Sequence, residues 1–290
     1  MSIFEETSFA LILNQTNLDT SDPSNSKYIY GFNGTRELKD TKVALSNVSM
    51  FYSWFNITSA LNNNTFSFIF PLAVPTTFNV TVPDGYYSIS DLNTYLQSFC
   101  ITNGLYLVNG SGQFVYYIEL VENPTFYSVQ LNCYPVPTAL PGTWTNPAGL
   151  VFPAVTATPQ LIVPSTNNFG TLIGFNAGTY PAVAQPTVYS KISDVTPRVN
   201  PVENIIVRCN LVQNNIANPS DVLYSFNASG VGFGSLVNSQ PYEYLYLDVC
   251  QGYYSQIEIS FVDQNYRAVQ INDPSIIVQL SFKSKKTSIL

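Results

Sequence analysis

Few side chains in this sequence could carry out acid–base or nucleophilic chemistry. The chain has no histidine, the residue that most often serves as general base or metal ligand. Two pairs of carboxylates stand close in sequence, Glu119 with Glu122 and Glu243 with Asp248. A glycosidase needs two carboxylates that face each other across a cleft, whereas solvated strand edges explain these acids equally well. A glycosidase-like enzyme is therefore the last of three functional hypotheses.

Other catalytic and binding motifs fail on spacing. The run from Gly230 to Gly234 (GVGFG) lacks the G-x-G-x-x-G spacing of a dinucleotide-binding loop, and we interpret it as a bulged or open loop. Without histidine, no Ser-His-Asp triad can form. No C-x-x-C pair occurs, and we expect buried free thiols at Cys100, Cys133, Cys209 and Cys250. We therefore predict that the protein is not an enzyme and binds no metal or cofactor.

Strands are the elements that must position any site. Apolar and polar residues alternate with the period of a half-buried strand at 64–70, 113–121, 203–213, 256–262 and 276–283. Further strands are predicted at 8–14, 27–32, 41–55 and 76–82. The last two alternating segments either pair with each other or lie in facing sheets. In both cases we expect one shared core that contains Ile257, Ile259, Phe261, Val278 and Leu280.

One segment has helical rather than strand periodicity. Apolar residues recur at helical spacing over 88–101, and Ser88 with Asp91 resembles a capping box at the start of a helix. Many strands with one short helix predict an all-β fold. We expect a single jelly-roll β-sandwich with one short helix and a proline-rich insertion.

The composition limits the partners of the protein. Charged residues are only 10% of the 290-residue chain, its net charge is −7, and aromatic residues are 14%. The small number of Lys and Arg side chains cannot provide the phosphate contacts that drive nucleic-acid binding. We therefore expect no specific binding of nucleic acid. Broad protein interfaces are poor in Lys, Glu and Asp and rich in aromatic residues, and this composition suits a protein whose surface is largely interface.

The middle of the chain differs from the rest. No charged residue occurs over 123–190, and 134–165 is rich in proline, which makes regular sheet unlikely there. Two interpretations remain open: a long extended loop laid across its own domain, or an insertion covered by a neighbouring subunit. We predict that 1–125 and 190–290 together form the jelly roll and that 126–189 is an uncharged insertion or extended loops.

Three of the chain's basic residues gather at its C-terminal end, at Lys283, Lys285 and Lys286. This tail could contact DNA, an acidic partner or a membrane, or it could simply be a solvated tail.

Several longer strings resemble a known family when they are considered together. They lie at 43–58, 68–96, 197–212 and 232–282. Two motifs are fairly specific: the turn PDGYY that begins at Pro83 and feeds the predicted helix, and the string FVDQN that begins at Phe261 and is followed by Asp273-Pro274 and a last strand. Together these strings resemble the penton, or minor capsid, proteins of virophages, polinton-like viruses and related large DNA viruses of eukaryotes.

The resemblance implies a structural role. It implies a non-enzymatic jelly-roll subunit of the virion, assembled in the host cytoplasm or nucleus. Five copies would close each icosahedral vertex as a homopentamer, surrounded by double jelly-roll major capsid proteins. Within that assembly we predict that Trp144 and Phe152 anchor a subunit interface, because buried aromatic side chains tend to carry interface energy.

A different class of function remains as an alternative. Tyr, Trp and Asn are residues that a carbohydrate-binding β-sandwich would use, and such a protein could attach a virus to a host-surface glycan or receptor.

Overall fold

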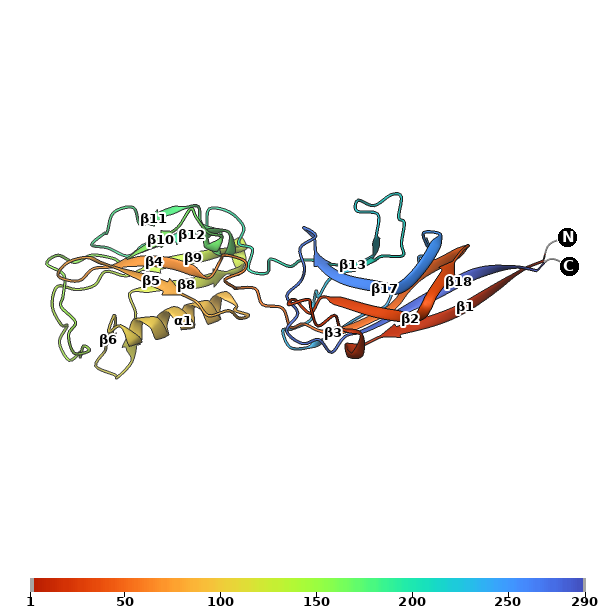
Figure 1. The fold of residues 1–290 in the computed structure, drawn as a ribbon. Coiled ribbons are helices and arrows are strands. Elements are labelled where there is room, and N and C mark those ends of the chain that lie inside the picture. Colours follow the sequence, from red (N-terminus) through yellow and green to blue (C-terminus); the bar gives the residue numbers. More distant parts are fainter. Residues whose placement is uncertain (1–2, 289–290) are drawn as a thin grey trace. The chain divides into compact units, whose positions relative to one another are not determined.

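The computed structural model describes residues 3–288, with side chains described for 7–284 (Figure 1). Strands account for 41% and helices for 9%, which confirms the predicted all-β class. No helix in the described part of the chain is long and apolar enough to cross a membrane. The chain forms two compact units: unit 1 comprises 1–54 and 202–290, and unit 2 comprises 55–201.

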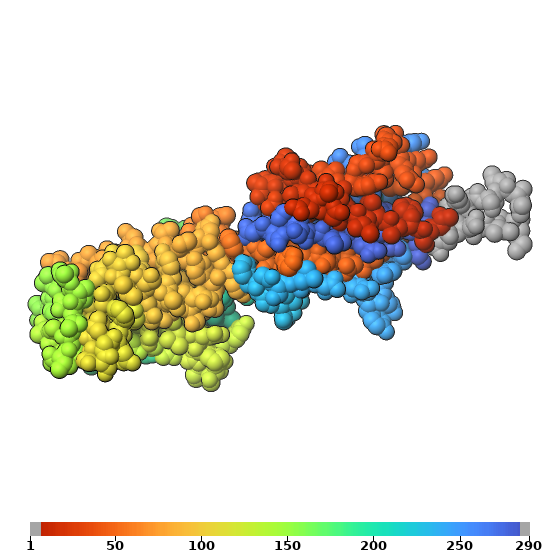
Figure 2. Space-filling model, turned by 90° about the horizontal axis from the view of Figure 1, so that it is seen from below, coloured from red at the N-terminus to blue at the C-terminus, as the bar shows by residue number. Residues whose placement is uncertain are grey.

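Unit 1 is built from two antiparallel sheets. The first has the order β1 (Ile3–Leu13), β18 (Ile277–Ser288), β3 (Thr41–Phe51) and β15 (Leu236–Ser239), and β16 (Leu247–Asp248) also pairs with β3. The second has the order β14 (Val222–Phe226), β13 (Ile205–Cys209), β17 (Gly252–Asp263) and β2 (Lys27–Leu38). A short 3₁₀ turn, Gln15–Asn17, joins β1 to β2. In Figure 2, β1 (red) and β18 (blue) lie side by side on the face shown.

The strand order of unit 1 is that of a jelly roll. When β15 and β16 are counted as one edge strand, the eight strands of the unit in chain order give sheets 1-8-3-6 and 5-4-7-2. This arrangement of two four-stranded sheets joined by Greek-key connections defines the jelly roll. Unit 2 enters the chain between the third and fourth of these strands, β3 and β13.

The predicted core of unit 1 is confirmed. Ile257, Ile259 and Phe261 of β17 and Val278 and Leu280 of β18 are all buried. The two strands lie in different sheets of the unit, so the second of the two predicted arrangements is the observed one. Alternation explains this outcome, because each strand turns every second side chain toward the layer between the sheets.

Unit 2 is a second β unit with a helix. Its larger sheet has the order β11 (Gly178–Tyr180), β10 (Gln160–Val163), β4 (Thr65–Phe70) and β5 (Thr76–Thr81). Its smaller sheet has the order β12 (Tyr189–Ile192), β9 (Ser128–Cys133) and β8 (Ile118–Asn123). The remaining elements are β6 (Leu107–Val108), β7 (Phe114–Val115), the 3₁₀ turn Pro124–Phe126, α1 (Ile89–Thr102) and α2 (Phe169–Ile173). One core cluster joins residues of both sheets and both α-helices.

Helix α1 begins as the sequence predicts. The Ser88 hydroxyl accepts a hydrogen bond from the Asp91 N–H, and the Asp91 carboxylate accepts one from the Ser88 N–H. The helix packs on β8 (Figure 1) and buries Ile89, Leu92 and Leu96 in the core of unit 2. This buried face explains the apolar spacing of the segment.

The structure divides the chain at different positions from those predicted. The range 55–125, which we assigned to the jelly roll, belongs to unit 2. The range 126–189 is not a separate insertion, because its strands β9 and β10 pair with β8 and β4 of the preceding range. Charge and proline content describe how exposed a segment is, but they do not specify which distant strand it pairs with.

Smaller differences concern single elements. The predicted strand 113–121 is two strands, β7 and β8, and Phe114 of the first is exposed while Ile118 of the second is buried. The proline-rich range 134–165 contains one regular strand, β10. The short helix α2 has no counterpart in the prediction.

Candidate functional site

Large apolar side chains are exposed at both open edges of the two sheets of unit 1, among them Phe9 and Tyr242. At one edge β1 and β2 are the outermost strands of their sheets, and they contact each other. At the other edge the outermost strands are β15 with β16, and β14. Such edges carry unpaired backbone groups and invite association.

A cleft opens between β1 and β2, and we call it the β1/β2 cleft. Its volume is about 210 Å³, and its lining consists mainly of apolar residues, among them Phe9, Tyr30, Phe32 and Phe282. Phe9 is 41% exposed and stacks on the buried Phe282 with 4.8 Å between ring centroids. Arg36 lies at the cleft with its guanidinium carbon 5.8 Å from the centroid of Phe9, a cation–π contact. The lining therefore combines several apolar side chains with one cation, Arg36.

The opposite edge carries a largely exposed segment, 241–246, which leads into β16 and which we call the edge segment. Tyr242 is fully exposed, and Leu245 is 67% exposed. Tyr246 ties the segment to the sheet, because its hydroxyl lies 2.9 Å from the Ser281 hydroxyl and Lys283 lies over its ring. Glu243 is exposed and forms no ion pair with any described side chain. The edge segment is therefore apolar and aromatic with one anion.

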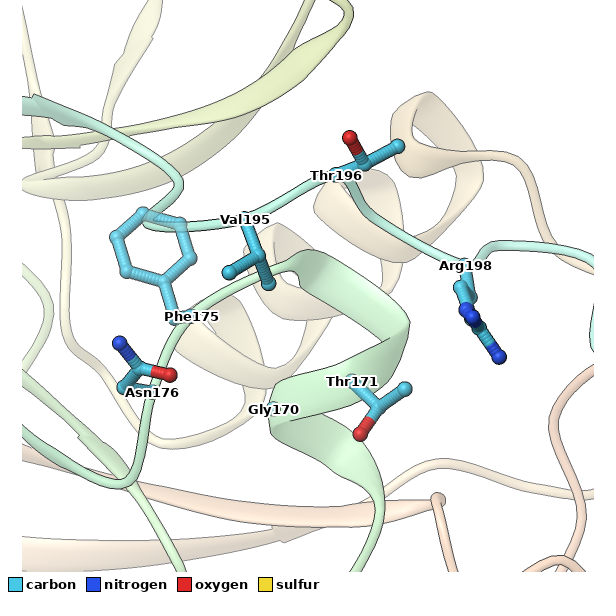
Figure 3. A pocket seen from close by; sticks show the side chains of 7 residues that line it. All are labelled: Gly170, Thr171, Phe175, Asn176, Val195, Thr196 and Arg198. Carbon is cyan, nitrogen blue, oxygen red and sulfur yellow. The ribbon is translucent and has the colours of Figure 1, made fainter.

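Unit 2 contains a larger pocket of about 370 Å³ (Figure 3). Its walls are α2 and the segment 194–198, which backbone hydrogen bonds hold together: the Val195 N–H donates to the Gly174 carbonyl and the Arg198 N–H donates to the Thr171 carbonyl. Gly174 has a φ of +77°, and a Cβ there would meet the Val195 carbonyl oxygen, so this close approach requires glycine.

The side chains of this pocket suit binding rather than catalysis. Arg198 and Asn176 lie at opposite ends of it, and Thr171 and Val195 lie between them (Figure 3). Arg198 is the only ionisable residue that lines the pocket, so no acid and base face each other there. A small polar or anionic ligand is what this lining could hold.

The two carboxylate pairs have structural partners or lie in solvent. Glu119 accepts hydrogen bonds from the Tyr134 hydroxyl at 2.6 Å and from the Asn132 amide. The bond to Glu119, together with burial, raises the pKa of Tyr134 to about 12. Asp248 forms an exposed ion pair with Lys42. Among the described residues no group of acids, cysteines and histidines could hold a metal ion.

The glycine run forms a loop, as predicted. Gly230 and Gly234 both have positive φ, near +77° and +79°, and the Gly234 N–H donates to the Tyr52 carbonyl. The run is followed by β15 and not by a helix, so it lacks the helix N-terminus that a phosphate-binding loop uses.

The predicted interface anchors pack on their own unit. Trp144 and Phe152 are each half-buried and lie against the core cluster of unit 2. This packing is what the first interpretation of the proline-rich range requires, in which the segment lies on its own domain. A role at a subunit interface stays a prediction, since the remaining surface of both side chains is free to contact another molecule.

The basic C-terminal residues belong to a strand. Lys283 lies in β18 with its ammonium 4.6 Å from the ring centroid of Tyr246. Lys285 and Lys286 are opposite Glu6 and Glu5 in the register of β18 with β1, and their side chains lie outside the described residues. Contact with DNA, an acidic partner or a membrane therefore stays a prediction.

The four cysteines are free thiols. Cys100, Cys133 and Cys209 are buried, and burial raises the pKa of each to about 12. Cys250 is only half-buried, which corrects the expectation that all four are buried. Its segment follows β16, and its N–H donates to the Leu211 carbonyl, beyond the end of β13.

Sequence reasoning did not identify the β1/β2 cleft or the edge segment. Glu243 was considered only as half of a carboxylate pair, and Phe9, Tyr30 and Arg36 were not considered. The run YEYLYL from Tyr242 to Leu247 is a signal that could have identified the edge segment, because so many aromatic residues around one acid are unusual for a solvated loop.

The fold and its open edges define unit 1 as a jelly-roll β protein without a recognisable catalytic centre among its described residues. Among solved structures, the chain is similar to the mavirus penton protein, with 9% identity over 99% of this chain and 100% of that one and a TM-score of 0.44. It is also similar to a chain in the electron cryomicroscopy structure of the Sputnik virophage, with 11% identity over 97% of this chain and 98% of that one and a TM-score of 0.42. No family model and no curated protein matches the chain.

Proposed function

We propose that the protein is a structural subunit of an icosahedral viral capsid, a penton subunit that forms homopentamers at the five-fold vertices. One observation carries the proposal: the strands of unit 1 have the complete jelly-roll order, and they include most of the strings that resemble penton proteins. Three of the four strings, at 43–58, 197–212 and 232–282, lie wholly or largely in unit 1.

The surface of unit 1 supports an assembling subunit. Both open edges expose large apolar side chains, such as Phe9 on one and Tyr242 on the other. Cyclic oligomers join two different patches of neighbouring copies, and two unlike edges on one subunit meet this requirement. Double jelly-roll major capsid proteins are the proposed partners around the vertex, and the virion is the proposed location.

A non-enzymatic role fits the side chains. Glu119 is engaged by Tyr134 and Asn132, and Asp248 is paired with Lys42. None of the four acids lines either of the two pockets described above, whereas a glycosidase needs two carboxylates across a cleft.

The test uses purified protein and virions. Sedimentation and negative-stain electron microscopy of the full chain are expected to show rings of five copies, and antibody labelling of virions is expected to mark the vertices. Rings of another order would contradict the pentamer, and labelling spread over the capsid faces would contradict the vertex position. Labelling outside the virion would contradict the capsid role.

The predicted anchors can be tested in the same particles. The double variant Trp144→Ala, Phe152→Ala is expected to lower vertex occupancy if both side chains are interface anchors, since each truncation of an anchor costs roughly 2 kcal/mol or more. If the melting temperature of the isolated subunit falls by many degrees and the vertices still fill, these residues serve only the core of unit 2.

The pocket of unit 2 favours a second candidate, binding of a host-surface glycan. Thr171, Asn176 and Arg198 could hydrogen-bond to hydroxyl or carboxylate groups of a saccharide. A glycan array with the wild-type protein and with Arg198→Ala decides this point: loss of a specific signal in the variant supports the site, and equal signals or none exclude it.

A further inference from the structure

We infer that the edge segment, 241–246, of one copy docks into the β1/β2 cleft of a second copy of this chain. The inference rests on the proposed function, because it specifies which surfaces of unit 1 meet when copies assemble. Three observations carry it: the level of the two surfaces along the strands, their shapes, and their charges.

The two surfaces lie at the same level of one sheet. Phe9 of β1 pairs with Phe282 of β18, Phe282 pairs with Val43 of β3, and Val43 pairs with Leu247 of β16. Paired residues stand directly opposite each other, so this row crosses the sheet from the β1/β2 cleft to the residue that follows the edge segment. The cleft and the edge segment are therefore at the two ends of one row.

The relative level of the two surfaces determines whether repeated contacts between copies form a ring or a filament. A contact between two different patches produces a ring if the rotation closes and an open filament if each copy is also displaced along the axis. Patches at the same level can meet around an axis parallel to the strands with no displacement along it. The observed row therefore suits a closed ring.

One of the two surfaces is a hollow, and the other presents exposed side chains. The β1/β2 cleft is a hollow of about 210 Å³ with exposed aromatic surface at Phe9. The edge segment presents Tyr242 and Leu245 outward, while Tyr246 holds its base on the sheet. Aromatic and aliphatic side chains that fill an apolar pocket are the usual centre of a protein interface.

The charges are complementary. Arg36 lies at the cleft, and its guanidinium contacts the ring of Phe9. It forms no ion pair with any described side chain. Glu243 stands within the edge segment between Tyr242 and Tyr244 and also lacks an ion pair with described side chains. Docking of unlike edges brings this cation and this anion together, whereas docking of two clefts would bring two arginines together.

A charge exchange tests the inference. Arg36→Glu and Glu243→Arg are each expected to weaken self-association of the full chain by roughly tenfold or more, because each places like charges across the contact. The double variant Arg36→Glu, Glu243→Arg is expected to restore association, since it recreates the pair in the opposite sense. Sedimentation over a wide concentration range measures the association, and circular dichroism with thermal melting shows that each variant is folded.

Two matched controls accompany the exchange. Glu122→Arg reverses an exposed acid of unit 2, and it is expected to leave association unchanged. Leu245→Asp is expected to weaken association, whereas Ile216→Asp, at a residue that is 98% exposed outside both surfaces, is expected to have no effect.

The outcomes separate this inference from the proposed function. If wild-type protein forms rings and neither single reversal weakens them, or the double variant fails to recover while its fold is intact, the docking is wrong and the penton role stands. If both reversals act and the double variant recovers, but the assemblies are not five-fold, the docking holds and the pentamer is wrong. If wild-type protein stays monomeric at every concentration, the docking is wrong. Vertex labelling of virions then tests the penton role independently.

Discussion

Replacement of Asn56 by alanine should destabilise unit 2 because this buried side chain joins segments that are far apart in sequence. Asn56 is 2% exposed. Its amide donates to the Tyr87 carbonyl at 2.7 Å and to the Val199 carbonyl at 2.9 Å, and its carbonyl accepts from the Tyr87 N–H at 2.8 Å. Asn56 is near the first residue of unit 2 and Val199 is near its last, so the side chain pins the two ends of the unit together.

The magnitude follows from these three bonds. Asn56→Ala removes all of them and leaves one N–H and two carbonyl groups of the backbone without this partner. Each lost bond costs about 1 kcal/mol net, and more where the remaining group stays dry. We therefore expect the free energy of unfolding of unit 2 to fall by about 3 kcal/mol. For a unit of this size that corresponds to a fall in melting temperature of roughly 6–12 °C.

Scanning calorimetry of the full chain measures the change, because it can follow the transition of unit 2. The matched control is Asn79→Ala. Asn79 is exposed, and the structure gives its side chain a single hydrogen bond, from the Ser67 hydroxyl. The control is expected to change stability by less than about 0.5 kcal/mol. If Asn56→Ala is as stable as this control, the three bonds do not hold the ends of unit 2 and the reasoning is refuted.

Three further predictions concern core packing, thiol reactivity and acid stability. Phe261→Ala should lower the stability of unit 1 by about 3–5 kcal/mol, measured by urea unfolding, because Phe261 is fully buried against Tyr28. Iodoacetamide at pH 8 should label Cys250 alone in the native protein, since burial and a pKa of about 12 protect the other three thiols; mass spectrometry that finds a buried thiol modified at the same rate would contradict this. Burial opposes ionisation of Asp194, but hydrogen bonds from Lys191, the Asn176 N–H and Tyr180 outweigh it and lower the pKa below 3.8. The stability that this carboxylate contributes is therefore present above pH 3.8 and is lost as the pH falls through its folded pKa, so Asp194→Asn should make stability less dependent on pH below about 4 than in the wild type.

Sequence periodicity determined most of the individual elements. Alternation specified the buried faces of β17 and β18, and the capping pair Ser88 and Asp91 specified the start of α1. These features are local: a strand turns alternate side chains to one face, and a cap satisfies donors within one helical turn. Residues that are close in sequence are therefore enough to predict these buried faces and this helix start.

Pairing between distant strands was decided only in three dimensions. The unit boundaries near Trp54 and Pro201 depend on β9 and β10 pairing with β8 and β4, and no local pattern records which strands pair. A proline-rich, uncharged composition described the exposed loops of 134–165 but not the strand β10 within it.

The same distinction between sequence pattern and tertiary structure applies to the β1/β2 cleft and the edge segment. The sequence indicated a protein rich in interface residues, because scarce charge and abundant aromatic residues are properties of composition. Only the sheet order brings Phe9 and Arg36 from β1 and β2 to one cleft, and only the register sets that cleft level with the edge segment on the far side of the sheet. A surface made by strands that are distant in sequence exists only after those strands have paired, so its position is a property of the tertiary structure.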